Sequence, residues 1–198
     1  MTVTIEIGKR TRRRARGFTL IELSVVVVIV GVLAVIGLVG YRRYRATARM
    51  SEATNMIAAI RTAQNEYKAE TGIYANVSND LASFYPNATP GRTATQWGAA
   101  CGNCKDGAQG WQRLKVQTPD PVVFGYATVA GVGGSAVPSL AAASSDIDTA
   151  INQQKALLGA TDPFFVALAQ GDTDGNGVTC HVLGLSHTNQ LVVSNQGE

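Results

Sequence analysis

Four residues have side chains suited to binding a metal or forming a disulfide: Cys101, Cys104, Cys180 and His181. Together they offer three thiolates and one imidazole, a set that zinc accepts. However, there is a single Cys-x-x-Cys pair, and the neighbours Cys180 and His181 would point to opposite faces of a strand. In a domain outside the cytoplasm the preferred interpretation is a disulfide between Cys180 and either Cys101 or Cys104, which leaves one cysteine over. Free thiols are the remaining alternative.

A second candidate site lies at residues 172–177, which read Asp-Thr-Asp-Gly-Asn-Gly. Alternating oxygen ligands from Asp172, Asp174 and Asn176, with the Val178 carbonyl as a further donor, match the first half of a calcium-binding loop. The match is incomplete because Leu183 stands where the final bidentate acid belongs. We therefore keep two interpretations, a calcium site and a plain Asp/Gly turn between two strands.

Catalytic signatures are absent from the sequence. There is no H-E-x-x-H, no G-x-S-x-G and no Walker loop, and the glycine-rich run 131–135 lacks the lysine that would bind a phosphate. His181 and His187 lie in a strand-like region, and we interpret them as surface or partly buried residues instead of an acid/base pair. We expect no enzyme and no required cofactor.

Glu22 is the one charged residue just inside a long apolar block. A carboxylate without a partner is unfavourable there, and no Lys, Arg or His occurs between Glu22 and Arg42. A cut after Gly17 would create a new α-amino group on Phe18, about one helical turn from Glu22. The two charges could then pair within one chain or between chains. The alternative is a glutamate at the interface that reaches water among the headgroups.

The apolar block predicts a transmembrane helix. From Leu23 to Tyr41 there are 19 residues without a formal charge, about 28 Å of helix against the ~30 Å hydrocarbon layer. Six basic residues precede residue 17 and four follow the span, which favours a cytoplasmic N-terminus and a translocated body. No A-x-A cleavage pattern follows the span, so we expect an anchor that stays attached.

The basic character of the chain is concentrated at its N-terminal end. The net charge is +3 and the pI is about 8.9, but six of the 17 basic residues lie before residue 17. Without that segment, 11 basic and 13 acidic residues remain, a net charge of −2. The pI is therefore no argument for nucleic-acid binding, and no specific nucleic-acid partner is evident.

Residues 16–23, Arg-Gly-Phe-Thr-Leu-Ile-Glu-Leu, resemble the processing motif of type IV prepilins and the related pseudopilins. The resemblance extends from Arg16 to about Tyr74 and is weak beyond. It implies that a prepilin peptidase and N-methyltransferase cuts between Gly17 and Phe18 and methylates the new Phe18 amine. It also implies that Glu22 meets the Phe18 amine of a neighbouring subunit during filament assembly.

The same resemblance implies the partners and the location of the protein. The partners would be the lipid bilayer before assembly, an inner-membrane assembly platform, and identical or related pilin subunits in a helical filament. The precursor would reside in a bacterial inner membrane, and the assembled filament would be extracellular or periplasmic. Some pseudopilins hold calcium near this end of the chain, which adds support to the calcium interpretation of residues 172–178.

The helical pattern continues past the span, with apolar residues at steps of three and four from Met50 to Tyr67 and a stop at Gly72. A helix from Phe18 to Glu70 would hold 53 residues and extend about 80 Å. The expected domains are a leader at 1–17, a transmembrane and assembly helix at 18–41, its amphipathic continuation at 42–71, and a β-rich head at 72–198.

The head reads as short strands separated by turns, with one helix from Ser145 to Leu158 or Gly159. We expect an α+β, pilin-like fold in which the long helix packs on a small antiparallel sheet. The predicted strands are Trp111–Val116, Val122–Ala130, Phe164–Ala169, Val178–Leu183 and Leu191–Val193.

These observations favour a structural subunit of a type IV pilus-like filament. The nearest alternative is a pseudopilin of a type II secretion system or a minor pilin, which shares every N-terminal feature. A third alternative is an anchored binding domain that never polymerises. Adhesion, motility, DNA uptake and secretion all use the same stalk, so the sequence does not select among them.

Overall fold

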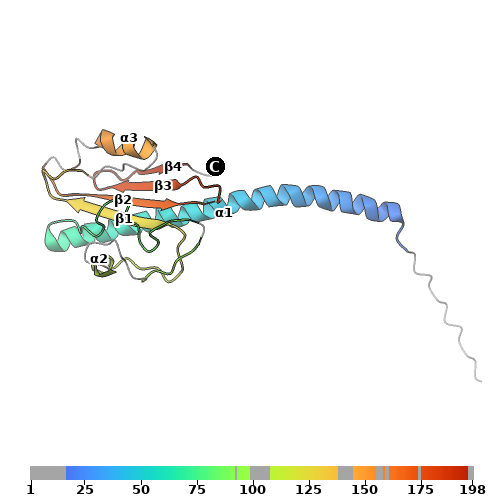
Figure 1. The fold of residues 1–198 in the computed structure, drawn as a ribbon, viewed down its shortest axis with the longest axis horizontal. Coiled ribbons are helices and arrows are strands. Elements are labelled where there is room, and N and C mark those ends of the chain that lie inside the picture. Colours follow the sequence, from blue (N-terminus) through green and yellow to red (C-terminus); the bar gives the residue numbers. More distant parts are fainter. Residues whose placement is uncertain are drawn as a thin grey trace, which may run out of the picture. The chain divides into compact units, whose positions relative to one another are not determined.

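The computed structural model describes residues 17–91, 93–98, 108–137, 145–154, 158, 161–173 and 175–195. Three helices and four strands lie in this part of the chain, in the order α1, α2, β1, α3, β2, β3, β4 (Figure 1). The chain divides into two compact units, one ending at Gly40 and one beginning at Tyr41, and helix α1 contributes to both.

Helix α1 runs without interruption from Leu20 to Thr71. At its end, Gly72 adopts a positive φ of 82° and its N–H donates to the Lys68 carbonyl over 2.8 Å, an arrangement that suits glycine because it has no Cβ. The helix therefore stops where the sequence predicted. In the first unit, the helix residues are all exposed, and this segment is long and apolar enough to cross a membrane.

The second half of α1 buries one stripe of side chains against the head. The stripe recurs at steps of three and four, as the sequence predicted. Its members are Ala46, Met50, Ala53, Met56, Ile57, Ile60 and Gln64. The polar Gln64 is tolerated because its amide donates to the Ala75 carbonyl and to Thr128 Oγ1, while its oxygen accepts from the Ala75 N–H.

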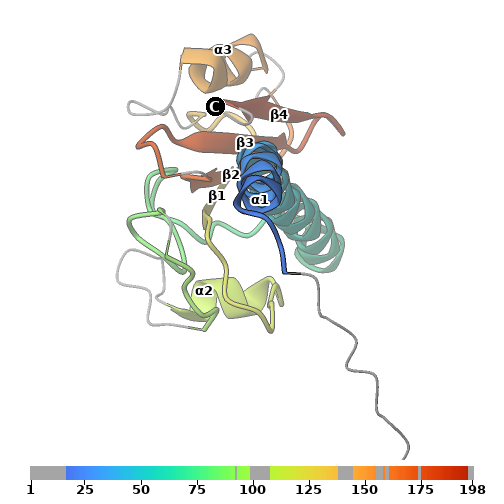
Figure 2. The same cartoon turned by 90° about the vertical axis from the view of Figure 1, so that its right-hand side faces the viewer.

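The four strands form one antiparallel sheet in the order β1-β2-β3-β4. Their bounds are β1 Gly125–Gly131, β2 Phe164–Gly171, β3 Cys180–Leu185 and β4 Leu191–Ser194. Helix α3, Ser145–Gln154, lies next to β4 (Figure 2). The α+β fold with a long helix and a small antiparallel sheet is confirmed.

The central strand β2 shows why both faces of the sheet are covered. Phe165, Ala167 and Ala169 belong to the apolar cluster shared with α1, whereas the alternate residues belong to a second cluster with Ile147 and Ile151 of α3. The near-continuous apolar sequence of β2 reflects this burial on two sides. A strand with one face in water would alternate apolar and polar residues instead.

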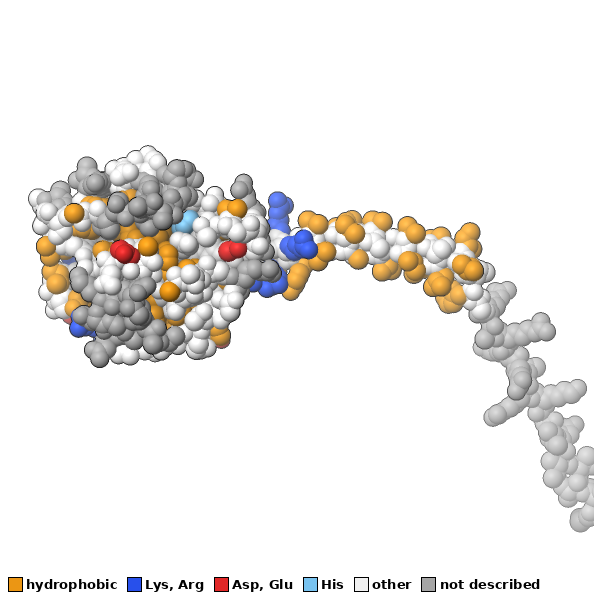
Figure 3. Space-filling view, in the orientation of Figure 1, with side chains coloured by type: hydrophobic (Ala, Val, Ile, Leu, Met, Phe, Trp, Pro, Cys, Tyr) orange, Lys and Arg blue, Asp and Glu red, His pale blue; other side chains and the backbone are white. Residues whose placement is uncertain are grey.

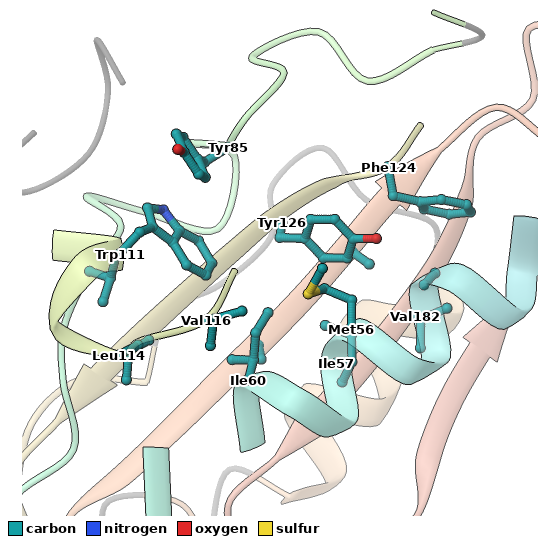
Figure 4. Packing of buried hydrophobic residues seen from close by; sticks show 14 of the residues in the cluster. Met56, Ile57, Ile60, Tyr85, Trp111, Leu114, Val116, Phe124, Tyr126 and Val182 are labelled. Atoms are coloured by element: carbon teal, nitrogen blue, oxygen red, sulfur yellow. The ribbon is translucent and has the colours of Figure 1, made fainter. Parts of the chain in front are cut away.

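One predicted strand, Trp111–Val116, is wrong. The chain forms helix α2, Ala108–Arg113, followed by a turn at Leu114 and Lys115. Trp111 and Leu114 are buried three residues apart, which is a helical spacing, and they pack beside Ile60 of α1 (Figure 4). The apolar run has β-forming residues, but contacts distant in sequence decide its conformation.

The other predicted elements agree with the structure within a few residues. β1 begins at Gly125 instead of Val122, and β3 begins at Cys180 instead of Val178. Helix α3 begins at Ser145 as predicted and ends at Gln154; residues 155–157 and 159 of the predicted helix lie outside the described residues.

Close packing of α1 on the sheet predicts a strong effect at Gly184. A Cβ added there would lie 2.7 Å from Ile57 Cγ2, so Gly184→Val should reduce the free energy of unfolding by about 1–3 kcal/mol. Combining it with Ile57→Ala should give a smaller loss than the sum of the two single variants, because the shortened side chain makes room. Chemical unfolding in detergent measures all three variants; strictly additive losses would contradict this contact.

Candidate functional site: the N-terminal segment and its supports

The residues predicted for processing lie immediately before α1. Residues 17–19 are outside any helix, and both Gly17 and Phe18 are exposed, with 85% of the Phe18 surface accessible. A peptidase binds its substrate in an extended form, so non-helical backbone at the Gly17–Phe18 bond suits cleavage. The proposed scissile bond is therefore presented at the boundary between irregular chain and helix.

Thr19 and Glu22 together cap the start of α1, which begins at Leu20. Its Oε2 accepts from the Thr19 N–H over 3.0 Å and from the Thr19 hydroxyl over 2.8 Å, and the Glu22 N–H donates to Thr19 Oγ1 over 3.3 Å. This reciprocal pattern is a capping box, in which a Thr and a Glu three residues later satisfy unpaired N–H groups at a helix start. This role of Thr19 was not among the predictions, although the spacing Thr-x-x-Glu signals it.

The helix behind Glu22 presents a row of apolar side chains in Figure 3, and all its residues up to Gly40 are exposed. The large hydrophobic residues from Leu20 to Val39 each expose between 51% and 87% of their surface. A soluble domain buries one stripe of such a helix, whereas a segment that is apolar all round requires lipid or other apolar helices. This surface is the part of the chain that association or membrane insertion must cover.

Two polar side chains, Arg49 and Glu52, bind the beginning of the second unit to the head. Arg49 Nη1 donates to the Thr173 carbonyl over 2.6 Å. Glu52 Oε1 accepts from the Val123 N–H over 3.0 Å and from the Tyr126 hydroxyl over 3.1 Å. Burial, and after it the neighbouring Glu52 carboxylate, raise the pKa of Tyr126, so the phenol stays protonated and remains a donor. No sequence signal pointed to these contacts.

The predicted calcium loop is organised by its own backbone in the described residues. Asp172 Oδ1 accepts from the Gly175 N–H and Oδ2 from the Gly177 N–H, and Asn176 Oδ1 accepts from the Val178 N–H. Asp174 lies outside the described residues, and within them no group of three His, Cys, Asp or Glu is placed to hold a metal. The geometry accounts for a turn between β2 and β3, and calcium binding stays a prediction.

Cys180 is a buried thiol, 2% exposed, whose Sγ donates to the Asn195 carbonyl over 2.8 Å. Cys101 and Cys104 lie outside the described residues, so the predicted disulfide stays a prediction. Cys180 faces the α1 cluster, and alternation along β3 turns His181 to the opposite face. The side chains of Cys180 and His181 therefore lie on opposite faces of β3, which argues against a zinc site that uses both residues.

The two histidines do not form a pair. His187 is exposed and its Nδ1 lies 2.9 Å from Ser186 Oγ. His181 is 2% exposed, and neither of its ring nitrogens has a hydrogen-bond partner in the described part of the chain. The expectation of a surface or partly buried position is therefore wrong for His181, because the sheet face on which it lies is covered.

The features described so far define a class of proteins. Its members have an N-terminal apolar helix, suited to a membrane or to a filament, and a small α+β head. A family model described as the prokaryotic N-terminal methylation motif matches residues 12–38. The chain is similar to the type IV major pilin protein PilA of Myxococcus xanthus, with 36% identity over 96 residues, 48% of this chain and 43% of the relative.

Two further relatives are similar over a shorter part of the chain. Fimbrial protein EcpC of Eikenella corrodens is 44% identical over 30% of this chain and 39% of the relative. The type IV major pilin protein PilE of Neisseria gonorrhoeae is 43% identical over 34% of this chain and 42% of the relative. The chain thus spans about two fifths of the length of these relatives, and no solved structure matches it. The motif and these relatives support the assignment of the chain to the type IV pilin family.

The burial of His181 predicts a pH-dependent stability of the head. Burial lowers the pKa of His181 below its ordinary value of 6.5, so the unfolded chain binds more protons than the folded one in mild acid. This destabilisation is absent above about pH 6.5 and grows as the pH falls towards the folded-state pKa. The free energy of unfolding should fall between pH 7.5 and pH 5.5, and it should fall less in His181→Phe than in the wild type. A substitution at the exposed His187, His187→Gln, is the matched control and should leave the wild-type decrease unchanged.

Proposed function

We propose that this chain is a structural subunit of a type IV pilus-like filament, processed between Gly17 and Phe18 and assembled through its N-terminal helix. The observation that carries the proposal is the position of Glu22. Glu22 is the single acidic residue between Leu20 and Gly40, the part of α1 whose apolar side chains are exposed.

The exposed apolar surface requires two successive environments. Before assembly, the stretch from Leu20 to Val39 suits the hydrocarbon layer of a bilayer in length and composition. In a filament, the same side chains would pack against the equivalent helices of other copies. Both environments remove the surface from water, which is the dominant favourable term in association.

Glu22 gives this association its specificity. A carboxylate among apolar helices is unfavourable unless a cation neutralises it, and processing would supply that cation as the Phe18 amine. The capping box occupies Oε2 of Glu22, while no hydrogen bond is recorded to Oε1 among the described residues. A neighbouring amine at that oxygen would pair the charges between copies and set their axial register.

The partners and location follow from this assembly route. We propose a prepilin peptidase and N-methyltransferase, an inner-membrane assembly platform, and identical or related pilins as partners. The precursor would lie in a bacterial inner membrane, and the filament would be extracellular or periplasmic. Relatives named as type IV major pilins favour a pilus over the pseudopilin or minor-pilin alternative.

Processing predicts a defined N-terminus. Protein extracted from filaments or membranes should begin at Phe18, with a methyl group on its amine, when examined by mass spectrometry. Gly17→Leu should leave residues 1–17 attached and prevent filament formation, because it fills the position next to the scissile bond. A native protein that retains its initiating methionine would contradict this route.

The charge of Glu22 can be separated from its capping role. Glu22→Gln keeps a side chain that forms a capping box and removes the charge. Thr19→Ala removes the box and keeps the charge. We expect filament yield, measured by shearing and electron microscopy, to fall at least about tenfold in Glu22→Gln. The Phe18 amine of the neighbouring copy would then be buried without a counter-charge, which is strongly unfavourable. Thr19→Ala should assemble to within about threefold of wild type, the loss of one helix cap being small.

Two outcomes would argue against the proposal. Normal function of Glu22→Gln with no filaments from the wild type would favour an anchored domain that never polymerises. A loss of filaments in Thr19→Ala equal to that in Glu22→Gln would show that helix capping, and not the charge, is required.

A further inference from the structure

Three exposed arginines stand at the beginning of the second unit: Arg42, Arg43 and Arg45, here called the arginine collar. None of them forms an ion pair with any residue that the structure describes, although Arg45 lies 5.9 Å from the centre of the Tyr41 ring. Their neighbour Arg49 is already bound to the head. Positive charge on the translocated side of a span opposes the proposed orientation, so the collar is unfavourable unless something compensates it.

Two exposed acids lie near the other end of the same helix: Glu66 and Glu70, here called the acidic pair. They are four residues apart, so they share a face and repel each other, and they stand at the end of α1 where the helix dipole disfavours anions. Lys68 between them is engaged elsewhere, with Nζ 3.5 Å from the Tyr74 hydroxyl. Within the described residues the acidic pair has no cation.

The outer face of α1 between the collar and the acidic pair carries short side chains. The exposed residues there include Ser51, Asn55, Ala58, Ala59, Thr62 and Asn65. Short side chains let another helix approach closely along this face, at the small end of the usual 8–10 Å spacing between axes. A long polar side chain would keep it away. The face therefore permits a parallel copy of α1 to lie alongside.

We infer that the arginine collar of one copy of this chain binds the acidic pair of another copy in the filament. The inference rests on the proposed function. About 24 residues of continuous helix separate Arg42 from Glu66, which corresponds to about 36 Å along the axis. A parallel copy displaced by that length brings the two sets of charges to the same height and compensates both.

The charge distribution favours a second copy over a lipid surface as the partner. Residues 50–198 carry 12 acidic and seven basic side chains, so the body of one copy attracts the collar of another. Collar and acidic pair are uncompensated in the same chain, and one contact satisfies both. Anionic headgroups would satisfy the collar alone and would leave Glu66 and Glu70 repelling each other.

Charge reversal tests the contact. Glu66→Lys/Glu70→Lys should reduce filament yield at least about tenfold while the processed protein in the membrane stays at its wild-type level. Arg42→Glu/Arg43→Glu/Arg45→Glu should do the same. Combining the two sets should restore yield to within about threefold of wild type, because the charges are exchanged and remain complementary. Asp120→Lys/Asp162→Lys is the matched control, since it makes the same change in net charge at exposed acids outside α1 and should assemble normally.

Three results would overturn the inference. The first is normal filament yield from both reversed sets, and the second is a combined variant no better than either set. The third is loss of membrane-inserted protein in the reversed collar with normal filaments in the reversed acidic pair, which would assign the collar to lipid headgroups. Absence of filaments from the wild type would instead remove the proposed function, so the two failures are distinguishable.

Discussion

The uncovered apolar surface of α1 is the constraint on which the other features depend. Between Leu20 and Val39 more than half of every large hydrophobic side chain is exposed, and no residue of this chain in the described part covers it. Water is an unfavourable environment for such a surface, so it requires lipid or other helices. The acid at the start of this surface, Glu22, has to be neutralised before the surface can be buried among apolar groups. On a soluble domain the same acid would remain in water and would need no partner.

The same helix serves a different purpose beyond Tyr41. There it buries one stripe against the sheet, and its polar side chains fasten the head: Glu52 to the loop before β1, Gln64 to Ala75 and Thr128, and Arg49 to Thr173. These contacts join the helix to segments more than ten residues away in sequence. The head is consequently built around α1, and removal of the helix would expose the sheet residues, such as Ala167 and Val182, that share a cluster with Ile57 and Ile60.

The family model agrees with this division of α1 into two parts. The N-terminal methylation motif matches residues 12–38, all of which precede Tyr41. In the proposed function, the N-terminal segment would have to satisfy a peptidase, a bilayer and neighbouring copies, each with narrow chemical demands. The head has to fold on one helix and to present a surface, and many sequences meet those demands. We therefore expect related pilins to resemble one another more closely in the stalk than in the head.

Much of the fold could be predicted from residues that lie close together in the sequence. The apolar run, the stop at Gly72, the stripe from Met50 to Gln64 and four of the five strands depend on periodicity and on turn-forming residues, which nearby sequence encodes. The missed capping box of Thr19 was also local, and its signal was present. Processing at Gly17 and pairing of the Phe18 amine with Glu22 remain predictions, because they concern events outside a single folded chain.

Tertiary packing decided what local pattern left open. Trp111 lies in a helix and not in a strand because it fills a space beside Tyr85 and Ile60, from segments far away in sequence. His181 is buried because the face of the sheet on which it lies is covered. Glu52 binds the head because the loop before β1 places backbone N–H groups, such as that of Val123, within hydrogen-bond distance of its carboxylate. In each case the neighbouring sequence does not specify which distant segment the side chain contacts. The sequence by itself therefore determined the long apolar helix, the sheet and the position of the charges. The partner of each polar group in the head was decided only when distant segments met, since burial is a property of the whole fold and cannot be read from neighbours along the chain.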